Sequence, residues 1–193
     1  MAAPIKLNLK IYQGSTFRQV LRWESSTKVY VPITNISKSA PVIVTASAHG
    51  VPVGWRARIT NSNVKEIVAL DYMTVTAATT DTVTFNQVNS LPFTTYTSGG
   101  VLEYNAPVPV GNYTARMQIR EKLNSDTIIH SLTTENNGII IDNTLKTITL
   151  YISSANTTAF TFTSAVYSLE LVANSEIIPF AGGSISLQYE VTR

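Results

Sequence analysis

Apolar and polar residues alternate along most of this 193-residue chain. A period of two places successive side chains on opposite faces of a strand, so each alternating segment predicts a strand with one buried face and one wet face. This half-buried pattern is typical of antiparallel sheets. The clearest alternating segments are residues 5–11, 55–59, 113–120, 147–152, 167–171 and 185–191.

Helix signals are few. The best is residues 153–159, where Ser153 or Ser154 is suited to cap a single turn and the β-branched Thr157 and Thr158 argue against a longer helix. Turn signals, by contrast, are frequent, and short strands separated by turns predict an all-β sandwich or barrel. The glycine-containing turn signals are at residues 13–15, 48–50, 98–100, 136–138 and 181–183.

The composition changes in the middle of the chain, where residues 37–103 are rich in Thr, Val and Ala and the flanking strands are longer. We therefore predict an antiparallel β-sandwich, residues 1–36 and 104–193, with a small β-barrel or β-sandwich domain, residues 37–103, inserted into one of its loops. The rival interpretation is one continuous sandwich with a long meander.

Hydrophobic residues make up 44% of the chain and charged residues only 13%. This balance supports a real core and excludes a chain that stays disordered.

The formal net charge of +2 is scattered, which argues against nucleic acid as a partner. The chain has no cysteine, so disulfides and thiol chemistry are excluded. No apolar run has the ~20 residues of a membrane helix and no signal peptide is visible, so we expect no membrane partner and synthesis in the cytoplasm.

No motif for catalysis, metal binding or cofactor binding stands out. The only histidines, His49 and His130, have no spaced ligands of the kind zinc requires, and structural roles are expected for both. The acidic residues fall mostly at turns or on the polar phase of strands, as Glu170 and Glu190 do. The pairs Gly99-Gly100 and Gly182-Gly183 lack the helix and Lys-Ser/Thr of a phosphate loop. We therefore predict a protein that is not an enzyme and has no catalytic residue, metal site or cofactor.

Two residues are candidates for an interface. Tyr151 is opposite in phase to Leu150 and Ile152 and is expected to be exposed, whereas Trp55 shares the phase of its apolar neighbours and is expected in the core. The strand 185–191 is suited to pair with a neighbouring subunit if it lies at a sheet edge. Replacing Gln188 with proline would test this pairing.

An ordered series of short motifs resembles a family of tailed-bacteriophage virion proteins with an immunoglobulin-like sandwich, akin to the N-terminal domain of phage baseplate upper proteins. Two departures weaken the match without changing the implied fold: Ser168 stands where the family usually has Asp, and Asn137 where many members have Gly. The matching motifs are Gln13-Gly14-Ser15-Thr16-Phe17, Trp23, Pro32-Ile33-Thr34, residues 113–120, Gly138-Ile139-Ile140-Ile141, Ile148-Thr149-Leu150, residues 166–171 and residues 190–193.

The middle segment resembles a small β module that recurs as a spacer in phage tail and fibre proteins. The residues that carry this second resemblance are 45–50, Gly54, 72–76 and 96–100.

These resemblances imply a structural, non-enzymatic component of the virion, in its tail, baseplate, neck or capsid surface. Other virion proteins would be its partners, and a symmetric ring or multiple copies of the chain are expected. The alternative is a host-receptor or carbohydrate-binding module of a phage tail or fibre, in which the inserted domain displays aromatic residues. A cellular β adhesion domain is a weaker third option.

Overall fold

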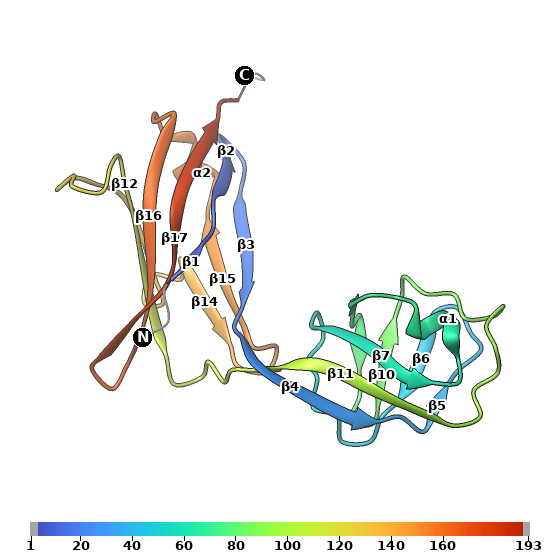
Figure 1. The fold of residues 1–193 in the computed structure, drawn as a ribbon. Helices are drawn as coiled ribbons and strands as arrows, with labels where there is room; N and C mark the ends of the chain where they lie inside the picture. The colour runs from blue at the N-terminus through green and yellow to red at the C-terminus, as the bar shows by residue number, and fades with distance from the viewer. Residues whose placement is uncertain (1–3, 191–193) are drawn as a thin grey trace. The chain divides into compact units, whose positions relative to one another are not determined.

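The computed structural model describes residues 4–190, and this part of the chain is mostly β-strand with two short helices. The all-β prediction is therefore confirmed. The chain divides into two compact units (Figure 1). Unit 1 contains the residues up to 22, residues 109–143 and the residues from 147 onward, and unit 2 contains residues 23–108 and 144–146.

Unit 1 has two sheets. A six-stranded sheet has the order β1-β17-β16-β12-β13, with β2 also paired to β17, and a three-stranded sheet has the order β14-β15-β3. The strands are β1 (Ile5–Lys6), β2 (Leu9–Tyr12), β3 (Phe17–Arg22), β12 (Thr114–Arg120), β13 (Ile128–Thr133), β14 (Ile139–Asp142), β15 (Thr147–Ile152), β16 (Ser164–Ala173) and β17 (Glu176–Gln188). Helix α2 (Ser154–Thr158) begins after Ser153, whose hydroxyl accepts a hydrogen bond from Asn156 N, as the capping signal predicted.

The core of unit 1 lies between these sheets, because the alternating apolar side chains of both are buried. Met117 and Leu169 are buried on the six-stranded sheet, and Ile148 and Leu150 on the three-stranded sheet. Tyr167 is also buried, and its hydroxyl donates to Leu7 O at 2.7 Å. Burial raises the pKa of Tyr167 to about 12.

Two features of β17 differ from the sequence-based expectation. Both β1 and β2 pair with β17 in parallel, whereas all other pairings of the described strands are antiparallel. Gly182 and Gly183, expected at a turn, lie inside β17. A Cβ on Gly183 would sit 2.4 Å from Leu7 O, so this glycine allows close approach of the N-terminal segment. The turn before β17 contains Asn174 and Ser175, both with positive φ.

Unit 2 has two four-stranded sheets with the orders β5-β6-β10-β9 and β4-β11-β7-β8. Its strands are β4 (Glu24–Pro32), β5 (Asn35–Ile36), β6 (Val42–Thr45), β7 (Arg56–Ser62), β8 (Met73–Thr74), β9 (Ala77–Ala78), β10 (Thr82–Phe85) and β11 (Gly99–Pro107). A short helix, α1 (Lys65–Val68), has no side-chain cap, which explains why no sequence signal marked it. Trp55 is fully buried in the core of this unit, as predicted, and its Nε1 donates to Asn105 O at 2.8 Å.

The unit boundaries differ from the predicted domain boundaries. Residues 24–36 were assigned to the outer sandwich, but β4 pairs with β11 inside unit 2. The predicted boundary between residues 103 and 104 falls within β11. Composition does not reveal the partner of a strand, so the first boundary was placed too late and the second too early. Independent folding of either unit stays a prediction, which a variant with residues 24–107 replaced by a short Gly-Ser linker would test.

Candidate functional site

Tyr151 lies on the central strand of the three-stranded sheet of unit 1. Its side chain is half-buried, less exposed than its phase suggested. Arg18 is its cross-strand neighbour on β3, and the guanidinium carbon lies 5.6 Å from the centre of the Tyr151 ring. The aromatic ring is therefore held in place by a cation–π contact on the outer side of the sheet.

The adjacent row of this outer sheet side is uncharged. Ile140, Thr149 and Val20 are aligned across β14, β15 and β3 by the strand register. The Ile140 side chain is 46% exposed and that of Val20 is 40% exposed. We name Arg18, Val20, Ile140, Thr149 and Tyr151 the Tyr151 face. It combines exposed apolar side chains with an anchored aromatic, as protein-binding surfaces do.

Gln188 lies at the end of β17, and its side chain is exposed. The edge position on which pairing at Gln188 was conditional is not found, because β16 pairs with one side of β17 and β1 and β2 pair with the other. Gln188 is aligned with Tyr12 of β2, and its carbonyl accepts a hydrogen bond from Gln13 N at 2.9 Å. Val191, the predicted last residue of the strand, lies outside the described residues. Gln188 is thus not at an open edge, because the N-terminal strand occupies that position.

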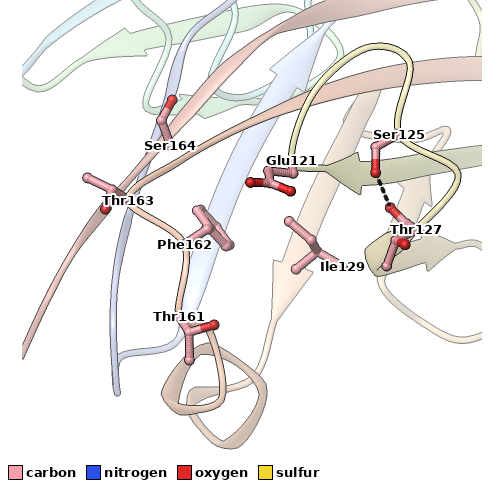
Figure 2. A pocket seen from close by; sticks show the side chains of 8 residues that line it. All are labelled: Glu121, Ser125, Thr127, Ile129, Thr161, Phe162, Thr163 and Ser164. Atoms are coloured by element: carbon pink, nitrogen blue, oxygen red, sulfur yellow. Dashed lines mark hydrogen bonds between the residues drawn. The ribbon is translucent and has the colours of Figure 1, made fainter.

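A pocket of about 630 Å³ opens in unit 1 beside the loop between β12 and β13 (Figure 2). One rim is formed by that loop and the other by the segment that leads into β16. Figure 2 shows the Glu121 carboxylate and the side chains of Phe162 and Ile129 between the two rims. The lining residues are Glu121, Ser125, Thr127, Ile129, Thr161, Phe162, Thr163 and Ser164.

The chemistry of this pocket is mixed. Glu121 is the one charged residue of the lining, and Phe162 offers a ring face beside it. Arg120 fixes the loop, because its guanidinium donates to Ser125 O and, at 2.8 Å, to Gln118 Oε1. The pocket can therefore offer hydroxyls, one carboxylate and an apolar wall to a small polar ligand. A single carboxylate is not the pair that glycoside hydrolysis uses.

A buried charge cluster in unit 2 was missed by sequence reasoning. Glu103 on β11 is 4% exposed. Its carboxylate accepts hydrogen bonds from Arg58 at 3.0 Å and from the Tyr72 hydroxyl at 2.9 Å, and it pairs with Lys28 Nζ at 3.0 Å. The Lys28 ammonium also donates to the Tyr72 hydroxyl and lies 4.6 Å from the centre of that ring. The carboxylate is thus fully engaged with other groups of unit 2.

The charges of this cluster stabilise one another. Desolvation raises the pKa of Glu103, but the hydrogen bonds from Lys28, Arg58 and Tyr72 outweigh it, so this pKa lies below its ordinary value. The hydrogen bonds to Tyr72 and Glu103 raise the pKa of Lys28. Glu103 and Lys28 are therefore both charged near neutral pH. The arrangement is typical of a structural ion-pair cluster rather than of an acid or base that exchanges protons.

Both histidines occupy packed positions. His49 is 3% exposed, its Nδ1 accepts from Val51 N at 3.0 Å, and its Nε2 lies 3.1 Å from Thr82 O. His130 makes an edge contact with Phe160 at 5.6 Å between ring centres, and burial lowers the pKa of His130. These contacts are consistent with the structural roles expected for the two residues.

Within residues 4–190, no group of three or more His, Asp or Glu side chains is arranged to hold a metal ion. In the same range, neither helix has the length and apolar character needed to cross a membrane.

The sequence identified Tyr151 but not the row beside it or the pocket. Ile140 and Val20 are far apart in the sequence, and only the register of β14, β15 and β3 brings them together. For Glu103, the only available signal was a charged residue between Leu102 and Tyr104 in a strand-like stretch, because such a residue needs cross-strand partners once it is covered.

No protein-family model matches this chain, and no curated protein matches its sequence.

Proposed function

We propose that this protein is a non-enzymatic structural component of a tailed-bacteriophage virion, in its tail, baseplate, neck or capsid surface, that assembles through protein–protein contacts. Other virion proteins and further copies of the chain are its partners, and the virion is its location. No cofactor takes part in this role.

The positions of the motifs that resemble the virion family support this proposal. Residues 114–120 form β12, residues 139–141 lie in β14, residues 148–150 lie in β15, and residues 166–171 lie in β16. The series thus falls mainly on paired strands of unit 1. Trp23 and Pro32-Ile33-Thr34 fall in unit 2, so the resemblance is weaker there.

The observation that carries the assembly role is the Tyr151 face. The exposed Ile140 and Val20 flank Thr149, which is itself only 9% exposed, and Tyr151 is anchored beside them by Arg18. A few anchoring side chains, among which Tyr and Arg are enriched, supply most of the binding energy of protein interfaces. A neighbouring virion protein is the occupant that fits this surface.

The proposal is tested by mass spectrometry of purified particles from infected host cells. We expect the chain in intact virions in multiple copies. In complementation with a Tyr151→Ala/Val20→Ser variant, we expect fewer copies per particle, whereas Ser168→Ala, on the separate six-stranded sheet, serves as the matched control. If infected cells contain the chain and intact virions lack it, the protein is not a virion component.

The pocket beside Glu121 and Phe162 favours a second candidate function, a host-receptor or carbohydrate-binding module. Sugars present hydroxyls that a carboxylate and Thr hydroxyls can bind, and a ring face can pack on the apolar side of a sugar. Binding of the isolated chain to a glycan array or to host cells, lost in Glu121→Gln and retained in Glu135→Gln, would favour this function. Absence of binding in all three proteins would favour the assembly role.

A further inference from the structure

Strand β4 forms the open edge of the sheet β4-β11-β7-β8 in unit 2. It is nine residues long, whereas a neighbour covers only one of its sides among the described strands. Tyr30 in this strand is 61% exposed. A long uncovered edge presents backbone N–H and C=O groups that another strand can bind.

The register identifies which groups point outward. Ile33 N donates to Gly100 O at 3.1 Å, and Pro32 is aligned with Val101. In an antiparallel ladder, alternate residues bond the partner, so Val31 and Val29 bond β11 like Ile33. The backbone N–H and C=O groups of Tyr30 and Lys28 then point away from β11.

Pro32 supports this assignment, because it has the same phase as Tyr30 and Lys28 and has no N–H to donate. Proline in a sheet is confined to positions where the missing N–H would face away from the ladder. The segment on the other side of Lys28 is less open, since Thr27 N donates to Ser25 Oγ at 3.0 Å. The available pairing segment is therefore Lys28 to Tyr30.

Lysine on an edge strand often prevents pairing by extending its charge beyond the edge. Lys28 is held differently, because its ammonium is bound by the Glu103 carboxylate and the Tyr72 hydroxyl on the sheet surface. Val29 and Val31, whose side chains pack against the core of unit 2, remain only partly buried. A strand placed beside β4 would cover the rest of these apolar side chains without meeting a free charge.

We propose that the open edge of β4 binds β4 of a second copy of this chain, in antiparallel register about a two-fold axis at Val29. In this register Lys28 of each copy is opposite Tyr30 of the other. Each such pair exchanges two N–H···O=C hydrogen bonds, so every outward backbone group of Lys28 and Tyr30 gains a partner. The Lys28 stem also packs beside the partner's Tyr30 ring, a favourable cross-strand pair.

Other registers are poorer. With the axis at Tyr30, Pro32 would lie opposite Lys28, and the Lys28 carbonyl would face a residue without an N–H. The Val29 register avoids this loss, because neither copy places proline opposite Lys28 or Tyr30. The two sheets then become one continuous sheet.

This inference rests on the proposed function, since it names one contact of the assembly. A short strand pair buries less area than a stable interface of ~1,200–2,000 Å², so the dimer is expected to be weak in dilute solution and strengthened where copies are held close together.

A cysteine test measures the register directly, because the chain contains no cysteine. Val29 of the two copies would face each other as a non-hydrogen-bonded pair ~4.5 Å apart between Cα atoms, within the range of a disulfide. We expect Val29→Cys in the full chain to form a disulfide-linked dimer under mild oxidation at least tenfold faster than Thr60→Cys. Thr60 is the control because it lies on β7, an interior strand of the same sheet.

A matched pair of variants then isolates the outward N–H. Tyr30→Pro and Tyr30→Ala both remove the ring, but only the proline removes the N–H. Added to Val29→Cys, Tyr30→Pro should abolish rapid cross-linking, and Tyr30→Ala should slow it by only a few-fold. Circular dichroism of each variant confirms that it is folded.

The edge proposal is overturned if Val29→Cys cross-links no faster than Thr60→Cys, or if folded Tyr30→Pro cross-links as fast as Tyr30→Ala. The virion proposal is judged separately by mass spectrometry of particles. A chain present in virions but inactive in cross-linking contradicts only the β4 contact, and a cross-linking chain absent from virions contradicts only the virion role.

Discussion

The edge strands β13 of unit 1 and β4 of unit 2 differ in how their outward backbone groups are satisfied. In β13, Thr133 N donates to Asn136 Oδ1 at 2.8 Å, and Asn136 Nδ2 donates to Ser131 O at 3.0 Å. Thr134 N bonds Ala115 O on the neighbouring strand, so Thr133 and Ser131 are in the outward phase. One loop side chain thus occupies two groups that a foreign strand would need.

In β4 the outward groups of Lys28 and Tyr30 have no comparable side-chain cap, and the lysine charge is held on the sheet surface by Glu103. The two edges therefore differ in whether a nearby side chain bonds the outward groups, and we propose that this difference gives them different capacities to bind a further strand.

The largest expected effect contrasts the two phases of β4. Val31→Pro removes an N–H that bonds β11, and we expect a loss of about 3 kcal/mol or more in the free energy of unfolding. Tyr30→Pro, in the outward phase, should cost less than about 1 kcal/mol relative to Tyr30→Ala. Chemical denaturation of the three variants measures both differences. Equal losses for the two prolines would show that the phase assignment is wrong.

The next effect concerns the ion pair between Lys28 and Glu103. Glu103→Gln removes the charge that Lys28 and Arg58 share, and we expect a loss of about 2 kcal/mol at neutral pH. The low pKa of Glu103 in the folded state means that its contribution is present above the unfolded pKa of about 4.3 and is lost as pH falls through the folded pKa.

Denaturation curves of the parent and Glu103→Gln should therefore converge as the solution is acidified below about pH 4. The same variant frees Lys28 to extend past the edge, so it should also slow cross-linking of Val29→Cys. If the difference in free energy of unfolding between the parent and Glu103→Gln is constant from neutral to acidic pH, the charge of Glu103 does not supply this stability.

A smaller effect is expected in the protected edge. Asn136→Ala removes the side-chain bonds to Thr133 N, Ser131 O and Gly138 N, and should cost about 1 kcal/mol. It also uncovers β13, so sedimentation should show new concentration-dependent association. Glu135→Gln, which leaves all three Asn136 side-chain bonds in place, is the neighbouring control. Unchanged association in Asn136→Ala would mean that the Asn136 side chain does not prevent association at this edge.

The smallest effect is predicted for an exposed pair in unit 1. Arg116 Nε lies 2.8 Å from Glu170 Oε2, and the side chains of Arg116 and Glu170 are 53% and 31% exposed. Glu170→Gln should change the free energy of unfolding by less than about 0.5 kcal/mol, and added salt should reduce the change further. If Glu170→Gln lost as much free energy of unfolding as Glu103→Gln, the burial of a carboxylate would not determine its contribution to stability.

Alternation in the sequence was sufficient to predict strands with one covered face, such as β12 and β16, and the phase of Trp55 placed this residue correctly in a core. In β15 it predicted the strand but not the burial of Thr147 and Thr149 on its polar phase. The cap at Ser153 likewise marked α2, since capping depends on neighbouring residues alone. These features are local, so a short stretch of sequence contains their causes.

The partners of the strands were not local, and there the predictions were incomplete. Composition placed one domain boundary inside β11, and the sequence left open whether β17 lies at an edge, which β1 and β2 in fact cover. A double glycine expected at a turn lies within β17, where the backbone of Leu7 passes close by. The sequence does not specify which distant segment approaches such a glycine.

The sequence by itself determined the all-β class, the buried face of strands such as β12 and β16, and the presence of an outward aromatic at Tyr151. Tertiary structure decided the rest: the row of Ile140, Thr149 and Val20, the engagement of Glu103, and the difference between the edges of β13 and β4. The physical reason is that side-chain phase follows from the two-residue repeat of a strand, whereas pairing depends on contacts between residues far apart in the chain.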